Sequence, residues 1–202
     1  MYKDTLLAVP TALLQNPAMP TPVELARGMV LLEVLHYDFL GKIKVGRIII
    51  HQLVLEHVRQ FFKEAFNLRF PIQSVIPVSE FNWCDGASCA ANNSSGHNMR
   101  SIEGTLSLLE KLSKHAGGCA IDINPFQNPC FVLDEKTAEL ELMRIIPPKG
   151  IYVPGTPGTL QKGHPLVELM ISLGWAWGGS WTFPKDYHHL QIVPAELAHY
   201  FM

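Results

Sequence analysis

The segment SKHAGGCAID, residues 113–122, constrains the fold more than any other part of the chain. Asp122 stands between Ile121 and Ile123, two side chains that we expect to point into a core. Burying an isolated carboxylate is costly unless a partner neutralises it or hydrogen-bonds to it. The fold must therefore bring a partner to Asp122. That partner is either a divalent cation or the backbone N–H groups of a loop that the carboxylate caps, and this segment alone leaves both open.

A histidine lies close to this aspartate in the sequence. His115 precedes Asp122 by seven residues, and Gly117, Gly118 and Ala120 between them let the backbone turn and pack closely. Imidazole nitrogen and carboxylate oxygen are both ligands that zinc accepts. The pair is therefore the first half of a candidate metal site.

A second group of ionisable residues lies in DYHHLQIV, residues 186–193. In a strand that begins near His188, alternate side chains share a face, so only one of His188 and His189 can face a given site. A turn at Pro184 can bring Asp186 round to the face of His189. Two histidines and one aspartate leave a fourth position open for water, as in catalytic zinc sites, and a nearby carboxylate such as Asp186 can then move the proton of that water. The nitrogen and oxygen ligand set suits Zn²⁺ best among the common ions.

Arg100, in the segment GHNMRS, is a candidate for holding the oxyanion that develops during attack on an amide. A guanidinium does not deprotonate and donates forked hydrogen bonds. The spacing of fifteen residues to His115 lets Arg100 face the same cleft, although spacing alone favours a solvated loop arginine.

Among the tryptophans, we expect Trp175 to pack in the core and treat Trp177 and Trp181 as candidate walls of a peptide cleft.

The chain of 202 residues has the length of one ordinary domain, and its net charge of −2 argues against a nucleic-acid partner. No apolar run reaches the roughly 18 residues that span a membrane, so we expect no transmembrane segment. The N-terminus has an apolar stretch broken by Pro10, which makes a poor secretory signal and leaves the localisation unknown. We expect a monomer. Cys84 and Cys89 could form a disulfide, but free thiols are favoured if the protein stays in the cytosol.

The hydrophobic patterns predict an α+β fold: a single domain with a mostly antiparallel sheet flanked by helices, because helices and strands do not alternate regularly. We expect an irregular lead-in over residues 1–30 and the functional domain over 31–202. The expected elements are a strand pair at 31–52, a helix at 52–67, a short strand at 72–81, a polar loop at 85–101, a short helix or ordered loop at 104–113, a buried strand at 118–125, a strand at 136–145, a helix at 164–174, an aromatic turn at 174–181, a strand at 188–193 and a helical turn at 194–201.

These residues together resemble the M15-type zinc D-Ala-D-Ala peptidases, whose pattern is S-x-H-x-x-G-x-A-x-D followed by a late D/E-x-x-H. The first part matches at Ser113, His115, Gly118, Ala120 and Asp122, and the second part at Asp186 and His189. The segments HYDFLGKIKVGRIIIH, ANNSSGHNMR, HAGGCAIDINPFQNP and GWAWGGSW are similar to the VanY-like and endolysin-like subgroup, so the resemblance runs from about residue 30 to 193.

The resemblance implies a hedgehog/DD-peptidase-like fold and a role for each matching residue. The zinc ligands would be His115, Asp122 and His189; Asp186 would be the general base and acid; Arg100 would polarise the scissile carbonyl or clamp the substrate; and Ser113 would support the site by hydrogen bonding. Ser180 and Leu190 depart from the family's usual aspartate and phenylalanine, which puts details of the substrate in doubt.

The implied activity is hydrolysis of peptidoglycan stem peptides, either by release of terminal D-Ala or by cleavage of the L-Ala–D-Glu bond. One alternative is a non-catalytic binding domain that keeps the fold and the metal, and another is a peptidase for a peptide outside the cell wall. The presence of Asp186 beside His189 argues for catalysis, because a binding domain does not need it.

Overall fold

A long antiparallel strand pair forms the framework of the molecule. In the computed structural model, which describes residues 2–102, 112–133 and 143–201, β2 (Met29–Tyr37) pairs with β3 (Ile43–His51) along nine residues. Gly41 adopts a positive φ of 73° in the connecting turn, a conformation that glycine takes without strain. The strand pair that the alternating pattern predicts is therefore confirmed.

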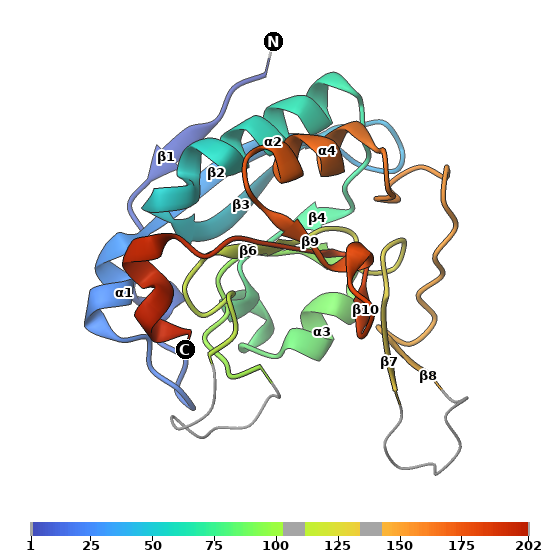
Figure 1. The fold of residues 1–202 in the computed structure, drawn as a ribbon. Helices are drawn as coiled ribbons and strands as arrows, with labels where there is room; N and C mark the ends of the chain where they lie inside the picture. Colours follow the sequence, from blue (N-terminus) through green and yellow to red (C-terminus); the bar gives the residue numbers. More distant parts are fainter. Residues whose placement is uncertain (1, 103–111, 134–142, 202) are drawn as a thin grey trace.

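Two helices cover one face of this pair, as Figure 1 shows. They are α2 (Leu55–Asn67) and α4 (Pro165–Ser172), and Gly174, with φ of 87°, follows the second of them. The main core forms between the helices and the strands. It includes Leu32, Val34, Ile48 and Ile50 from the strands, Val58, Phe61, Phe62 and Ala65 from α2, and Leu166, Val167 and Met170 from α4. Both predicted helices are confirmed.

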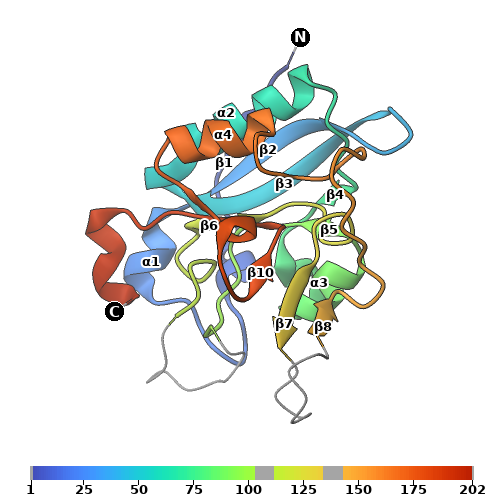
Figure 2. The same cartoon turned by 45° about the vertical axis from the view of Figure 1, so that its right-hand side comes forward.

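The site elements lie on the other side of the strand pair in both views (Figures 1 and 2). β6 (Ala120–Asp122), β11 (His189–Gln191) and β9 (Ala176–Trp177) form a small antiparallel sheet in the order β6–β11–β9. Its register sets His189 directly opposite Asp122. A third sheet has the order β10–β7–β8, with β10 at Lys185–Asp186, β7 at Cys130–Leu133 and β8 at Met143–Ile146. The predicted α+β class with mostly antiparallel sheets is confirmed.

The first thirty residues are more ordered than the predicted irregular lead-in. β1 (Thr5–Leu7) adds to the edge of β2, followed by η1 (Thr11–Leu14) and α1 (Val23–Gly28). Leu14 and Leu25 are buried in a second core cluster with Phe201, which follows the C-terminal η5 (Ala195–Tyr200). This segment is ordered because its leucines pack into the core, and its prolines do not prevent that packing. The division of the chain near residue 30 stays a prediction.

The prediction of a polar loop over residues 85–101 is wrong. This segment contains α3 (Asp85–Ala90) and β5 (Asn93–Ser94), which pairs in parallel with β4 (Ser74–Val75). Most of its polar side chains are buried, and hydrogen bonds offset the cost of burying them. Asn93, for example, accepts from the N–H of Ile76 at 3.0 Å and donates to the same residue's carbonyl at 2.8 Å. The polar composition of this segment therefore did not predict that its side chains are buried.

Short 3₁₀ helices complete the described structure: η2 at Gln52–Val54, η3 at Val78–Phe81 and η4 at Gly178–Ser180. The helix or ordered loop expected at 104–113 and the alternation expected at 136–145 fall largely outside the described residues, and β8 is the described end of the latter. Within the described parts of the chain, no helix is long and apolar enough to cross a membrane. The four cysteines are free thiols.

Gly118 joins the site segment to the framework sheet. It adopts φ of 63°, and its carbonyl accepts the backbone N–H of His51 at 2.9 Å. A Cβ there would lie 2.6 Å from that backbone nitrogen, so Gly118→Ala should lower the free energy of unfolding by roughly 2–4 kcal/mol. Gly41→Ala is the matched control: its φ is similar but its surroundings are open, and it should cost only about 1 kcal/mol. Urea unfolding of both variants tests this, and equal losses would contradict it.

Candidate metal centre

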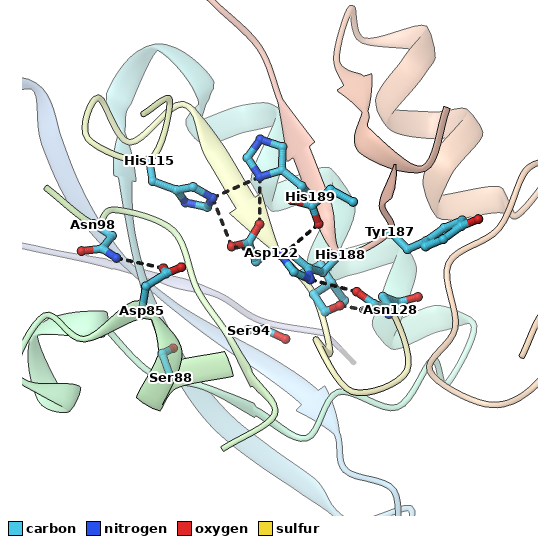
Figure 3. Close-up of polar contacts among 12 residues, drawn as sticks. Asp85, Ser88, Ser94, Asn98, His115, Asp122, Asn128, Tyr187, His188 and His189 are labelled. Atoms are coloured by element: carbon cyan, nitrogen blue, oxygen red, sulfur yellow. Dashed lines mark hydrogen bonds and ion pairs between the residues drawn. The ribbon is translucent and has the colours of Figure 1, made fainter. Parts of the chain in front are cut away.

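Three buried side chains from separate segments converge on one point (Figure 3). His115 comes from the turn at 114–118, Asp122 ends β6 and His189 begins β11. The Nε2 of His115 lies 3.2 Å from Nδ1 of His189 and 3.1 Å from Oδ2 of Asp122, and the His189 nitrogen lies 2.9 Å from Oδ1 of Asp122. Zinc bound tetrahedrally at about 2.0–2.1 Å holds its ligand atoms about 3.3 Å apart, so this spacing fits a single ion.

The outer nitrogens of both imidazoles are held by oxygen atoms that can only accept. The Nδ1 of His115 donates to the carbonyl of Gly96 at 2.6 Å, and the Nε2 of His189 donates to Oε1 of Gln191 at 2.9 Å. The inner nitrogens therefore carry lone pairs, which face each other and the carboxylate of Asp122. A proton would satisfy only part of this arrangement, whereas a divalent cation accepts all three lone pairs. The donor set thus fits a metal.

Local charges keep the aspartate ionised. Burial raises the pKa of Asp122, but the neighbouring His115 and His188 outweigh it and hold that pKa well below the usual value. Burial lowers the pKa of His189, yet the hydrogen bond and charge of Asp122 raise it overall. The ionised carboxylate of Asp122 therefore supplies a negative charge that attracts a cation.

Asp186 and His188 form a second pair beside the centre. The Nε2 of His188 lies 2.9 Å from Oδ1 of Asp186 and 3.9 Å from Oδ2 of Asp122, while its Nδ1 donates to the carbonyl of Asn128 at 2.8 Å. Burial lowers the pKa of His188, but the two carboxylates raise it to about 10. Burial in turn raises the pKa of Asp186, and His188 lowers it below its ordinary value. The imidazolium thus stabilises Asp186 as a carboxylate, which can accept a proton.

The expectation that only one of the two adjacent histidines can face the site is wrong. β11 begins at His189, so His188 lies outside the regular strand and its side chain is not bound to alternate with its neighbour. Both rings consequently reach Asp122.

A cavity of about 520 Å³ adjoins the centre, and Asp186, His188 and His189 line it. Arg100 also lines it, with Nε 3.4 Å from Oδ1 of Asp85. Ser113 lies at the same cavity, and its Oγ accepts the backbone N–H of His115 at 3.3 Å. These positions agree with the roles that the resemblance implies, which themselves remain proposals.

The two candidate cleft tryptophans differ in position. Trp181 lines the cavity, with its ring 5.5 Å from that of His189. Trp177 instead lies in the main core, where its indole N–H donates to the carbonyl of Tyr187 at 2.9 Å. It is not positioned as a cleft wall, because that hydrogen bond and the core hold the ring inward. Trp175 packs in the core as expected.

Sequence reasoning missed the groups that orient the imidazoles. The sequence could have indicated Gln191 as a partner of His189, because it stands two residues after His189 and shares its face of the strand. The carbonyls of Gly96 and Asn128 carried none, because a backbone oxygen has no residue-type signature.

Two imidazoles and a carboxylate around one point, with a second carboxylate at the adjoining cavity, are the arrangement of a metallopeptidase centre. Residues 109–192 match the family model described as D-alanyl-D-alanine carboxypeptidase, and this segment contains His115, Asp122, Asp186 and His189. This segment is therefore a domain of the M15 D-alanyl-D-alanine carboxypeptidase family, as the resemblance predicted. Comparison with curated proteins and with solved structures yields no match.

The match begins at residue 109, whereas the predicted resemblance begins near residue 30. The VanY-like and endolysin-like subgroup is not resolved by it and stays a prediction. The role of Arg100, which precedes the matched segment, also stays a prediction.

Proposed function

We propose that this protein is a zinc-dependent peptidase that hydrolyses peptide bonds in the stem peptides of bacterial peptidoglycan. The observation that carries the proposal is the convergence of two imidazole lone pairs and the carboxylate of Asp122 within a D-alanyl-D-alanine carboxypeptidase family segment. Zinc is proposed because nitrogen and oxygen ligands with room for a fourth ligand suit it best.

Each residue of the site has a task in this reaction. The ion, when bound, would supply Lewis acidity, lowering the pKa of water toward about 7 and polarising a carbonyl. Asp186 accepts the proton of the attacking water and passes it to the leaving amine. His188 orients Asp186 and keeps it ionised between turnovers. Arg100 donates to the oxygen of the scissile carbonyl, where negative charge develops.

Two bonds in the stem peptide are candidates. Release of terminal D-Ala and cleavage between L-Ala and D-Glu both require attack of water on an amide carbonyl, so the same residues serve either reaction.

Digestion of purified peptidoglycan peptides, followed by mass spectrometry, tests the proposal, because each new terminus identifies the bond that was cut. We expect one zinc ion per chain by elemental analysis and new termini that vanish when a chelator is added. Zinc binding without any cleavage would favour a non-catalytic binding domain. Cleavage of unrelated peptides, but not of stem peptides, would place the substrate outside the cell wall.

A further inference from the structure

The β7–β8 hairpin turns one regular face toward the cavity. Cys130 and Val132 of β7 and Arg144 and Ile146 of β8 all line it. They form two cross-strand pairs, Cys130 with Ile146 and Val132 with Arg144, and alternate residues of a strand share a face. Three of these four side chains are apolar, and Arg144, a permanent cation, is the charged member of this side of the cavity.

The charge of Arg144 has no partner among the residues that the structure describes. The other arginine and the lysine at the cavity are engaged: Arg100 lies beside Asp85, and Lys114 lies over the ring of Phe201 at 4.4 Å. Arg144 is exposed, and no described carboxylate lies within 4.0 Å of its guanidinium. A guanidinium that stays charged and presents forked donors is suited to a carboxylate from outside the chain.

The hairpin is joined directly to the strand that carries Asp186. Cys130 pairs with Asp186 across the β7–β10 ladder. The Val132–Arg144 pair lies two residues further along β7, which is about 7 Å at the rise of an antiparallel strand. Arg144 stands on β8, two strands from β10, which adds about 10 Å sideways, so its Cα lies about 12 Å from that of Asp186. An extended peptide covers that distance in about four residues, and the long side chain of Arg144 shortens it, so Arg144 is placed to contact a substrate group a few residues from the bond that Asp186 serves.

We propose that Arg144 determines specificity by binding a carboxylate of the substrate peptide, while Val132 and Ile146 pack against a small apolar side chain next to it. The inference rests on the proposed function and deepens it: the substrate is an acidic peptide whose free carboxylate lies near the cleaved bond. Arg144 acts in binding, and the residues around the metal centre perform the chemistry.

The test uses the pentapeptide L-Ala–γ-D-Glu–L-Lys–D-Ala–D-Ala and two versions of it, one amidated at the α-carboxyl of D-Glu and one amidated at the C-terminus. The zinc-loaded wild type should prefer the parent peptide over one of the amides by about tenfold in kcat/KM, mainly through KM. Arg144→Gln should abolish that preference while cleaving the disfavoured amide within about twofold of the wild type. Arg144→Lys should restore part of it, because it keeps the charge without the fork.

Arg27→Gln, which changes an exposed arginine of α1 outside the cavity lining, is the matched control and should behave like the wild type. Fluorescence anisotropy with labelled peptides separates the two proposals. If the wild type binds the peptides without cleaving them, the proposed hydrolysis fails, and the anisotropy of Arg144→Gln still tests the carboxylate contact. A full preference retained by Arg144→Gln, an equal loss on all three peptides, or no binding by the wild type overturns the inference.

Discussion

Replacing Asp186 with asparagine should lower kcat by about 10²- to 10⁴-fold and leave the zinc content unchanged. The side chain is not among the three groups that converge on the metal point, so removing its charge should not release the ion. An amide cannot accept the proton of the attacking water, and it cannot pass a proton to the leaving amine. Steady-state kinetics on stem peptides, combined with elemental analysis of the same samples, measure both quantities.

The control for this substitution is Glu24→Gln, which neutralises an exposed carboxylate on α1 and should not change kcat. Full activity in the Asp186 variant would show that another group moves the proton. Loss of zinc from it would show instead that Asp186 helps to hold the ion. Either result would remove the assignment of Asp186 as general base and acid.

Replacing Asp122 with alanine should weaken zinc binding by more than about 100-fold, the upper end of the loss caused by removing a group that only supports a ligand. The carboxylate is the anionic member of the site, and without it two imidazole lone pairs face each other at 3.2 Å with less charge to attract a cation. Hydrolysis should fall below detection at ordinary zinc concentrations. Competition with a chromophoric chelator measures the affinity.

A graded comparison distinguishes loss of a ligand from general damage to the fold. Gln191→Ala removes only the acceptor that orients His189, so it should weaken zinc binding by about 10- to 100-fold, less than Asp122→Ala does. Circular dichroism of both zinc-free variants should match that of the zinc-free wild type. Equal zinc affinity in Asp122→Ala and the wild type would contradict the proposed ligand set.

Local patterns were sufficient for the elements that bury one face. The alternation in residues 31–52 and the helical spacing of Val58, Phe61, Phe62 and Ala65 predict the framework sheet and its helix, because each depends on neighbours only a few residues away. The same reasoning failed at residues 85–101. The buried amide of Asn93 bonds there to both the N–H and the carbonyl of Ile76, and no local pattern records a contact seventeen residues away.

The sequence by itself determined which groups are available for the site: two histidines and an aspartate as ligands, and a second aspartate, Asp186, three residues before His189. Only the tertiary structure decided how they meet. The register of β6 against β11 sets Asp122 opposite His189, and His188, which lies just before the first residue of β11, is free to reach Asp186. The oxygens of Gly96 and Gln191 decide which ring nitrogens face the ion. The physical reason is that a backbone carbonyl has the same chemistry in every residue, so its place beside an imidazole follows only from the folded chain.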